Sequence, residues 1–435
     1  MRTAYDAVII GAGPAGSTAA VLLARAGWSV ALVEKQCFPR RKVCGECIAA
    51  SNLPLLDALG ISCAFEASAG PALRQLALMR GRHAIVAGLP PAADSNYRWG
   101  HALGRETLDS LLLERARAVG AQVLQPWSVR AIEGTLGDWR LEVRARGTDP
   151  TWTLRAPVVI DAHGSWEGLA AGHPQALAAH KPSDLLAFKA NFRNAALADG
   201  MLPVLSFDGG YGGMVMADGG LATVACCIRR DRVDAIRACA PGASAGDAVE
   251  AMLKRQCSGV ASALQGAVRI GSWLAAGPIH PGIRLGRYGT HAGRKGDGPF
   301  CIGNAAGEAH PILGEGMSMA LQSAQLLCER LLDDGHQRAA SKGATAPGTA
   351  PWRLADGRRA KAPGAGAQRE AGRAYAAEWR RQFEPRMRLA AVFAQLAMRP
   401  GPAQLLVALA RCWPGLLTAG ARWGGKTSVP RSLRA

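Results

Sequence analysis

The first thirty-five residues alternate between short apolar runs and a glycine-rich break. Residues 6–10 and 28–33 are apolar, β-prone runs, and residues 17–26 have the small and aliphatic composition of a buried helix. The break is Gly11-Ala12-Gly13-Pro14-Ala15-Gly16, and Glu34 ends the second run. The pattern therefore predicts a strand, a glycine turn, a helix and a second strand that closes on an acid.

The same reading extends to the middle of the chain. Residues 103–119 carry apolar positions on one helical face, and 121–124 follow as a short strand. Three runs that alternate apolar and polar positions predict a three-stranded meander: 128–133, 139–144 and 151–155. Residues 157–161 form a buried-strand pattern, so we expect them to resume the sheet that begins near residue 5.

The second half of the chain changes character. Residues 185–274 are largely β in pattern, and a helix is expected over 317–332. Helical spacing returns at 375–398 and 402–412. The prediction is an α/β protein in four parts: a discontinuous Rossmann-type domain over 1–184 and 275–334, an inserted β-sheet domain over 185–274, a flexible basic linker over 335–372, and a C-terminal helical segment over 373–435.

The glycine turn has the chemistry of a dinucleotide site. Gly11 permits the tight turn, Gly13 lets the backbone approach a pyrophosphate, and Gly16 lets helix and strand pack closely. The helix N-terminus directs unpaired N–H groups at the anion. Glu34 lies where a carboxylate can accept both ribose hydroxyls, which favours FAD or NAD over NADP in this site.

Composition limits the alternatives. No apolar run reaches membrane-spanning length, and the strand pattern begins by residue 5, so we expect no membrane span, no signal peptide and a cytoplasmic protein. Eleven cysteines show no disulfide framework. Cys44 and Cys47 form a C-x-x-C without a second pair, so no metal site is expected.

The net charge of +18 is concentrated at the C-terminal end. From His336 onward there are 18 Lys or Arg against 4 Asp or Glu, and the rest of the chain is nearly neutral, which argues against a uniform nucleic-acid-binding surface. The explanations that remain open for the basic end are a solvated tail without a partner, a docking segment for an acidic protein, and a contact with nucleic acid or an anionic membrane.

Five separated segments together resemble one family. Residues 5–35, 38–48, 103–121, 157–166 and 299–333 are similar, in order and spacing, to the FAD-dependent monooxygenase superfamily, which includes geranylgeranyl reductases and flavin-dependent halogenases. The resemblance implies an FAD domain of the aromatic-hydroxylase, glutathione-reductase-like kind, with an inserted β-sheet substrate domain. The flavin ring is then expected between the two.

The resemblance also implies a set of cofactor contacts. Arg105 would lie near the phosphates and ribose, and residues 304–317 would cover the pyrophosphate, ribityl chain and ring. The backbone amides of a glycine turn at a helix N-terminus would stabilise the negative charge of reduced flavin. Asn304 stands where the family commonly has aspartate, and His163-Gly164 where it commonly has Asp-Gly. The predicted FAD-binding residues are Gly11, Gly13, Pro14, Ala15, Gly16, Glu34, Lys35, Arg41, Lys42, Cys44, Gly45, Arg105, Asn304, Gly314, Glu315, Gly316 and Met317.

Two features separate the functions within this superfamily. No lysine lies between Lys42 and Lys181, and no Trp-x-Trp-x-x-Pro segment is present, which argues against a halogenase. Residues 38–48 resemble those of geranylgeranyl reductases and of flavoproteins that mature tryptophylquinone cofactors by oxygenating a tryptophan of a partner protein. The segment Gly303-Asn304-Ala305-Ala306-Gly307-Glu308-Ala309-His310-Pro311 and the basic tail favour the second.

The leading hypothesis is hydroxylation of an electron-rich aromatic ring through a flavin C4a-hydroperoxide, with NAD(P)H as reductant and the substrate carried by an acidic protein partner. Glu46 and His310 are candidates for a proton relay or substrate contact, and Tyr211 and Phe188 for walls of the site. The alternatives are a salt bridge of Glu46 with a cation of residues 40–42, a hydrogen-bonded loop histidine, and a packing tyrosine. The rival functions are a flavin reductase of isoprenoid double bonds and a non-catalytic scaffold that binds an acidic partner.

Overall fold

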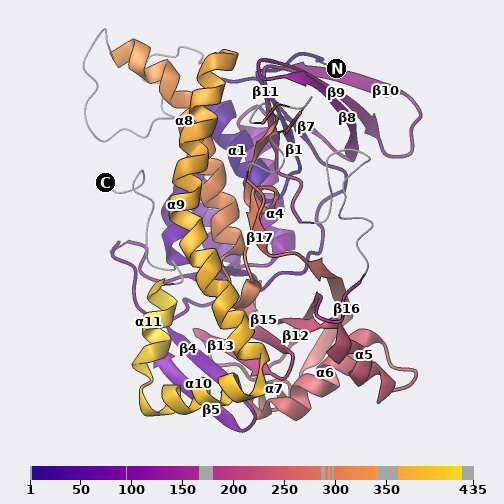
Figure 1. The fold of residues 1–435 in the computed structure, drawn as a ribbon, viewed down its shortest axis with the longest axis vertical. Coiled ribbons are helices and arrows are strands. Elements are labelled where there is room, and N and C mark those ends of the chain that lie inside the picture. Colours follow the sequence, from indigo (N-terminus) through magenta and orange to yellow (C-terminus); the bar gives the residue numbers. More distant parts are fainter. Residues whose placement is uncertain are drawn as a thin grey trace.

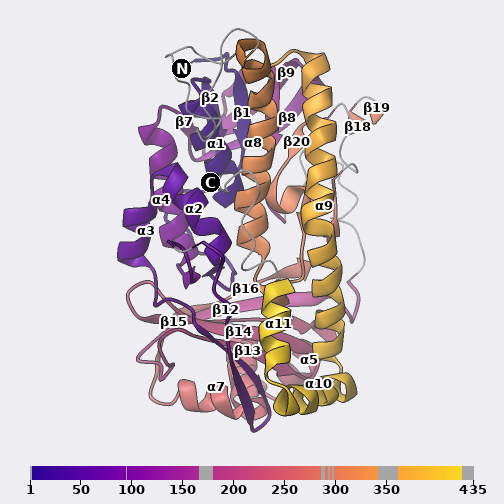
Figure 2. The same cartoon turned by 90° about the vertical axis from the view of Figure 1, so that its left-hand side faces the viewer.

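The computed structural model describes residues 2–94, 96–165, 180–285, 290–291, 294–295, 298–340 and 361–423, with only the backbone of 290–291, 294–295, 313, 334–340 and 423. Two sheets dominate the molecule and lie one above the other. Figure 2 shows the five-stranded sheet with its helices in the upper half, the seven-stranded sheet in the lower half, and helix α9 along both. The α/β architecture with a parallel sheet is as predicted from the sequence.

The five-stranded sheet has the order β20-β11-β1-β2-β7, and every neighbouring pair is parallel. All residues of β1, β2 and β11 are buried, which explains why these strands are continuous apolar runs. Helix α1 packs against both α4 and α8 on one side of the sheet. The strands are β1 (Ala7–Ile10), β2 (Val30–Val33), β7 (Gln122–Leu124), β11 (Val158–Asp161) and β20 (Phe300–Cys301), and the helices are α1 (Pro14–Arg25), α4 (Arg105–Ala118) and α8 (Gly316–Ala340).

The predicted meander is present as an antiparallel three-stranded sheet. Its strands are β8 (Trp127–Thr135), β9 (Asp138–Ala145) and β10 (Thr151–Ala156), in the order β10-β9-β8. Trp139, Leu141 and Val143 alternate along β9 and are fully buried in the core that the meander shares with β1 and β11. The other face of β9 is polar. The meander therefore covers one side of the parallel sheet and leaves a polar face outward.

The seven-stranded sheet has the order β16-β12-β15-β14-β13-β4-β5. Strand β4 runs parallel to β13 from the pair Gln75 with Met201 onward, so the hairpin of residues 75–88 belongs to this sheet. The sequence-based boundary had placed that hairpin in the first domain and had ended the insertion at 274, whereas β16 continues to Ile279. The strands are β4 (Gln75–Arg80), β5 (His83–Gly88), β12 (Leu185–Arg193), β13 (Met201–Phe207), β14 (Gly210–Ala217), β15 (Leu221–Arg229) and β16 (Val268–Ile279).

The two faces of this sheet have different neighbours. Phe188, Ala190 and Phe192 pack toward α5 (Arg230–Ala238), α6 (Ala245–Gln256) and α7 (Ser258–Ala263). Leu185, Ala187 and Tyr211 lie on the opposite face, against the 38–48 segment, the loop before α8 and the end of α9. Phe188, which we expected as a wall, still borders the main cavity.

The C-terminal part is helical: α9 (Ala365–Met398), α10 (Pro400–Cys412) and α11 (Gly415–Trp423). The predicted linker over 335–372 is wrong at both ends, because α8 continues to Ala340 and α9 already begins at Ala365; its middle, 341–360, lies outside the described residues. Helix α9 packs along α8 (Figure 1) and buries Tyr375, Trp379 and Phe383. It is therefore part of the body of the molecule.

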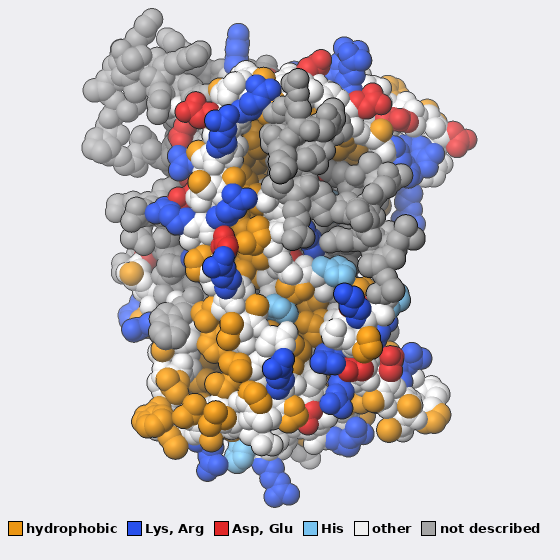
Figure 3. Space-filling model, viewed as in Figure 1, with side chains coloured by type: hydrophobic (Ala, Val, Ile, Leu, Met, Phe, Trp, Pro, Cys, Tyr) orange, Lys and Arg blue, Asp and Glu red, His pale blue; other side chains and the backbone are white. Residues whose placement is uncertain are grey.

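The surface over α10 and α11 is apolar, with orange side chains gathered there in Figure 3. Leu405, Trp413 and Leu416 are exposed large apolar residues on this corner. Within the described ranges, no helix is both long and apolar enough to cross a membrane. The short elements are β3 (Cys47–Ile48), η1 (Ala50–Asn52), α2 (Leu53–Leu59), α3 (Ser62–Ser68), β6 (His101–Ala102), β17 (Gly282–Ile283), β18 (Thr290–His291), β19 (Arg294–Lys295), η3 (Gly303–Ala305), β21 (Gly307–Glu308) and η4 (Pro311–Leu313).

Candidate functional site

One cavity of about 400 Å³ connects the glycine turn with the seven-stranded sheet. Four of the predicted site residues are not among those that line it: Gly16, Arg41, Glu315 and His310. The predicted residues that line it are Gly11, Gly13, Pro14, Ala15, Glu34, Lys35, Lys42, Cys44, Gly45, Glu46, Arg105, Tyr211, Asn304, Gly314, Gly316 and Met317. Segments far apart in the sequence therefore meet at a single site.

The glycine turn is as compact as the sequence suggested. Gly11 has a φ of +97°, and a Cβ there would meet the Ala162 carbonyl oxygen at 2.6 Å. A Cβ on Gly16 would lie 1.9 Å from the Gly11 carbonyl oxygen, so Gly16 serves the packing of α1 on β1 and not the cavity wall. Helix α1 begins at Pro14, which places its N-terminal amides at the cavity.

Glu34 is held in a fixed orientation at the end of β2. Its Oε2 accepts the backbone N–H of Ala12 at 2.9 Å, and its Oε1 accepts the N–H of Gln36 at 2.9 Å and the Arg40 Nη1 at 3.0 Å. The side chain is 3% exposed and borders the cavity. A carboxylate oriented in this way fits the ribose of an adenosine bound at the turn.

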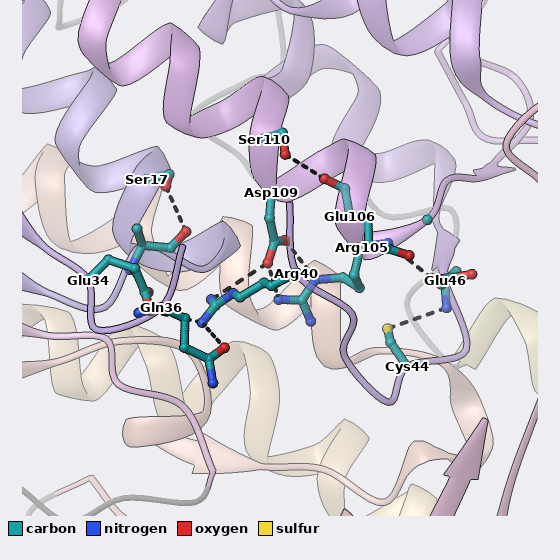
Figure 4. Close-up of polar contacts among 12 residues, drawn as sticks. Ser17, Glu34, Gln36, Arg40, Cys44, Glu46, Arg105, Glu106, Asp109 and Ser110 are labelled. Carbon is teal, nitrogen blue, oxygen red and sulfur yellow. Dashed lines mark hydrogen bonds and ion pairs between the residues drawn. The ribbon is translucent and has the colours of Figure 1, made fainter. Parts of the chain in front are cut away.

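Cations surround the backbone of Gly13. A Cβ on Gly13 would lie 3.7 Å from the Arg40 Nη2 and 3.8 Å from the Arg105 Nη2. Asp109 orients Arg105 through two bonds of 2.7 and 2.8 Å (Figure 4). Burial, reinforced by Arg40 and Arg105, lowers the pKa of Lys42 to about 8. An excess of cations at a helix N-terminus is suited to a dianion such as a pyrophosphate.

The guanidinium group of Arg40 also indicates that an anion binds near Gly13. Its Nε is buried and has no hydrogen-bond partner among the described residues, as expected of a guanidinium group that binds an anionic ligand. Arg41, which was predicted to bind the cofactor, lies outside the cavity, and its Nε is 3.9 Å from Glu106. The run Arg40-Arg41-Lys42 gave no signal to separate its members, because a loop without periodicity does not fix which side chain points inward.

The loop before α8 lines the other end of the cavity. Gly314 has a φ of +67°, and α8 begins at Gly316, so Gly316 and Met317 bring a helix N-terminus to the cavity. Asn304 donates its amide nitrogen to the Ser165 Oγ at 2.7 Å, which leaves its amide oxygen available to accept a hydroxyl. Glu315, in contrast, lies 3.7 Å from Arg386 of α9, away from the cavity.

A buried ion pair that was not predicted from the sequence supports this loop. The Arg284 Nη2 donates to Glu308 Oε2 at 2.9 Å, and its Nη1 donates to the Asn304 carbonyl oxygen at 3.0 Å. Ser165 donates to the other oxygen of Glu308 at 2.9 Å. Glu308 and Ser165 border the cavity, so this network fixes the backbone at Asn304.

Glu46 adopts a φ of +58°, which is unusual for a residue with a side chain, and it is 1% exposed. Its carboxylate is paired with Lys189 of β12, accepts the Thr223 hydroxyl at 2.5 Å and accepts the Arg105 backbone N–H at 3.0 Å. The predicted alternative of a salt bridge within residues 40–42 was right in kind but wrong in partner. No local pattern could have identified Lys189, which lies 143 positions away.

Tyr211 and His310 meet beside the apolar end of the cavity. The Tyr211 hydroxyl lies 3.4 Å from the His310 Nδ1. Burial, with smaller contributions from Cys227 and Glu308, raises the pKa of Tyr211 well above its ordinary value, and burial lowers the pKa of His310. Both side chains are therefore neutral near pH 7. The nearby walls are apolar: Leu202, Pro203, Val204, Val215, Ala276 and Ile279.

The glycine turn, the oriented acid, the cation cluster and the helix N-terminus facing a second sheet together define a flavin-binding oxidoreductase fold. The chain matches the family model described as "FAD binding domain" over residues 4–232. It belongs to this FAD-binding family, and the residues around Gly13 fit the cofactor.

Curated relatives match only parts of the chain. A tryptophan 2-halogenase of Chondromyces crocatus is 32% identical over 161 residues, which cover 36% of this chain and 30% of that protein. A 1H-pyrrole-2-carbonyl-[peptidyl-carrier protein] chlorinase of Pseudomonas fluorescens is 30% identical over 178 residues, 37% of this chain and 39% of that protein. The matches thus span about a third of these relatives.

Solved structures match nearly the whole fold. The myxobacterial chondrochloren halogenase CndH has a TM-score of 0.67 at 17% identity, over 99% of this chain and 95% of that one. A geranylgeranyl bacteriochlorophyll reductase-like protein of Thermoplasma acidophilum has 0.66 at 16%, over 97% and 99%. PqsL of Pseudomonas aeruginosa, a probable FAD-dependent monooxygenase, has 0.60 at 18%, over 97% and 99%. At these identities the likeness establishes the fold alone.

Proposed function

We propose that this protein is an FAD-dependent monooxygenase that hydroxylates an electron-rich aromatic ring. The observation that carries the proposal is the continuity of the main cavity, which runs from the cation cluster at Gly13 to the apolar walls around Tyr211. Bound FAD would supply the activation of oxygen. The protein must then hold a flat apolar ring at the flavin end and exclude water from it.

The neutral Tyr211 and His310 pair suits proton transfer at the apolar end. A phenol hydroxyl beside an uncharged imidazole can pass a proton between the ring and the histidine without creating a buried charge at rest. We assign the proton relay to these two residues. Glu46, whose carboxylate is occupied by Lys189 and Thr223, is assigned to positioning the 38–48 segment against the sheet.

The substrate ring would be a tryptophan side chain of an acidic partner protein, as in the maturation of tryptophylquinone cofactors. The support is charge: after Glu384 the chain contains eight Lys or Arg and no acid. NAD(P)H would serve as reductant. In that reaction NAD(P)H, a proton, oxygen and the ring give NAD(P)⁺, water and the hydroxylated ring.

The test is oxygen-dependent oxidation of NAD(P)H by the FAD-loaded protein, with indole and tryptophan-containing peptides as probes. We expect stimulation by the probe and one atom of ¹⁸O from ¹⁸O₂ in the product. Incorporation of bromide from the buffer would identify a halogenase. Anaerobic saturation of an isoprenoid alkene would identify a reductase, and failure to bind FAD at all would leave a scaffold.

A further inference from the structure

A second cavity, of about 590 Å³, adjoins the adenosine end of the main one. Lys35 and Ser128 line both cavities. Its remaining walls come from residue 36, from Pro126, and from strands β8 and β9 with the turn that follows them. Nothing in the proposed reaction uses this space.

Three arginines converge on this cavity because of the strand register. Ser128 of β8 faces Arg144 of β9, and Arg146, directly after the end of β9, lines the same cavity. A bulge between Val129 and Ala131 leaves Arg130 without a pairing partner, and Arg130 lines the cavity together with Ser128. Val143, which precedes Arg144 on β9, points into the core instead.

The charges of these arginines are not balanced locally. Arg130, Arg144 and Arg146 form no ion pair and no side-chain hydrogen bond within the part of the chain that the structure describes. Asp149 is the single acid among the residues that line this cavity, against these three arginines. Three like charges on one cavity wall repel one another, so a ligand that brings negative charge would reduce this repulsion.

The chemistry of the ligand follows from the donors. Guanidinium groups bind phosphate through paired N–H donors, and several of them together favour a dianionic monoester over a singly charged diester. The cavity begins at Lys35, directly after the acid that selects an unphosphorylated ribose in the main site. A second nucleotide that binds in this cavity would therefore differ from the nucleotide in the main site by a phosphate group on its ribose.

We propose that this basic cavity binds the 2′-phosphate of NADPH and makes NADPH the reductant. The role of NADPH as reductant rests on the monooxygenase function proposed above. The phosphate-binding site itself is argued from the three arginines and does not depend on that function. NADPH differs from NADH by one dianionic group on the adenosine ribose, and this cavity is built for such a group.

The binding test uses the FAD-loaded full chain and titrates 2′,5′-ADP, 5′-AMP and inorganic phosphate by calorimetry. We expect 2′,5′-ADP to bind at least about tenfold more tightly than 5′-AMP, with an affinity that falls as salt rises. The double variant R144Q/R146Q should lose about 100-fold for 2′,5′-ADP, while R144K/R146K keeps part of the affinity. The R411Q variant, on the distant helix α10, is the matched control. Flavin absorbance and circular dichroism should be unchanged in all three.

Kinetics complete the test. We expect kcat/KM for NADPH, but not for NADH, to fall in R144Q/R146Q. If inorganic phosphate binds as tightly as 2′,5′-ADP, or if NADPH oxidation is equal in wild type and R144Q/R146Q, the inference is wrong. If 2′,5′-ADP binds through these arginines but no NADPH is oxidised with any aromatic probe, the binding site stands and the proposed monooxygenase function falls.

Discussion

The two ends of the main cavity are built in opposite ways. The dinucleotide end consists of backbone approached closely through glycines and of cations around Gly13. The sheet end consists of apolar side chains from β13, β14 and β16, with Tyr211 as its polar member. The first end binds its ligand through charge and close contact with the backbone. At the second end, substitution of the side chains can change which ligand is bound. Such a division allows one cofactor site to serve many substrates.

The backbone end should tolerate almost no change. In Gly16→Ala the new Cβ would lie 1.9 Å from the Gly11 carbonyl oxygen, so α1 must move away from β1. We expect a loss of more than about 4 kcal/mol of unfolding free energy and no retained flavin. Gly401→Ala is the control, because its Cβ meets nothing within 4 Å. Thermal unfolding and flavin content measure both, and a G16A protein that holds FAD normally would refute this account.

The boundary between the ends should be nearly as sensitive. Lys189→Met leaves the Glu46 carboxylate buried without its cation, which costs about 3–5 kcal/mol. The double variant E46L/K189M should recover most of that loss, since both charges are then absent. Urea unfolding of the single and double variants gives the coupling energy. Additive losses would show that the pair does not join the two parts of the molecule.

The sheet end should affect catalysis more than folding. In Tyr211→Phe the proton path to His310 is cut, and we expect kcat to fall about 100-fold with FAD content unchanged. Tyr375→Phe, also buried but donating to the Cys301 carbonyl oxygen, is the matched control. If both variants turn over alike, Tyr211 is a packing residue.

The pH profile tests the partner of Tyr211. Because burial lowers the pKa of His310 below its ordinary value, the imidazole is neutral at pH 7 and becomes protonated only at acid pH. The rate should therefore decline as the pH falls through that lowered pKa. His310→Asn should be slow but lack this acid limb. An acid limb retained in the variant would assign it to another group.

The smallest effect is expected at Lys42. Its pKa of about 8 in the free protein should rise when the pyrophosphate binds, so binding takes up a proton between the two values. FAD affinity should then fall as the pH rises above about 8. Lys42→Gln should bind FAD about tenfold more weakly at pH 7 and show a flatter pH dependence. Arg41→Gln, next to it but outside the cavity, should change neither.

The sequence predicted what is local in the chain. Gly11, Gly13, Gly16 and Glu34 lie within one βαβ unit, where turn geometry and strand length fix their relation. The helix N-terminus at Gly316 was equally local. The ion pairs of Glu46 with Lys189 and of Arg284 with Glu308 depend on how segments distant in the sequence pack together. The periodicity of a single segment does not predict that packing.

Helix α9 was missed in its first turns for a different reason. Its composition of Ala, Gly and Arg is typical of a linker, and this outweighed the spacing of Ala371, Tyr375, Trp379 and Phe383, which lie four residues apart and are all buried. The hairpin of β4 and β5 lies within residues 1–184, which we expected to belong to the Rossmann-type domain, but it is part of the seven-stranded sheet. Its partner β13 is parallel and more than a hundred residues away, beyond any local signal.

The length of α9 has a consequence for how the molecule works. Near the start of α9, the Tyr375 hydroxyl donates a hydrogen bond to the Cys301 carbonyl oxygen. In the middle of α9, Arg386 pairs with Glu315 of the loop before α8. At its end, the Met398 carbonyl oxygen accepts the N–H of Gly209 in the turn between β13 and β14. This one helix thus sets the distance between the dinucleotide end of the main cavity and the strands that form its apolar wall. Substitutions in that apolar wall can therefore change which molecule the cavity binds without changing the distance between its two ends.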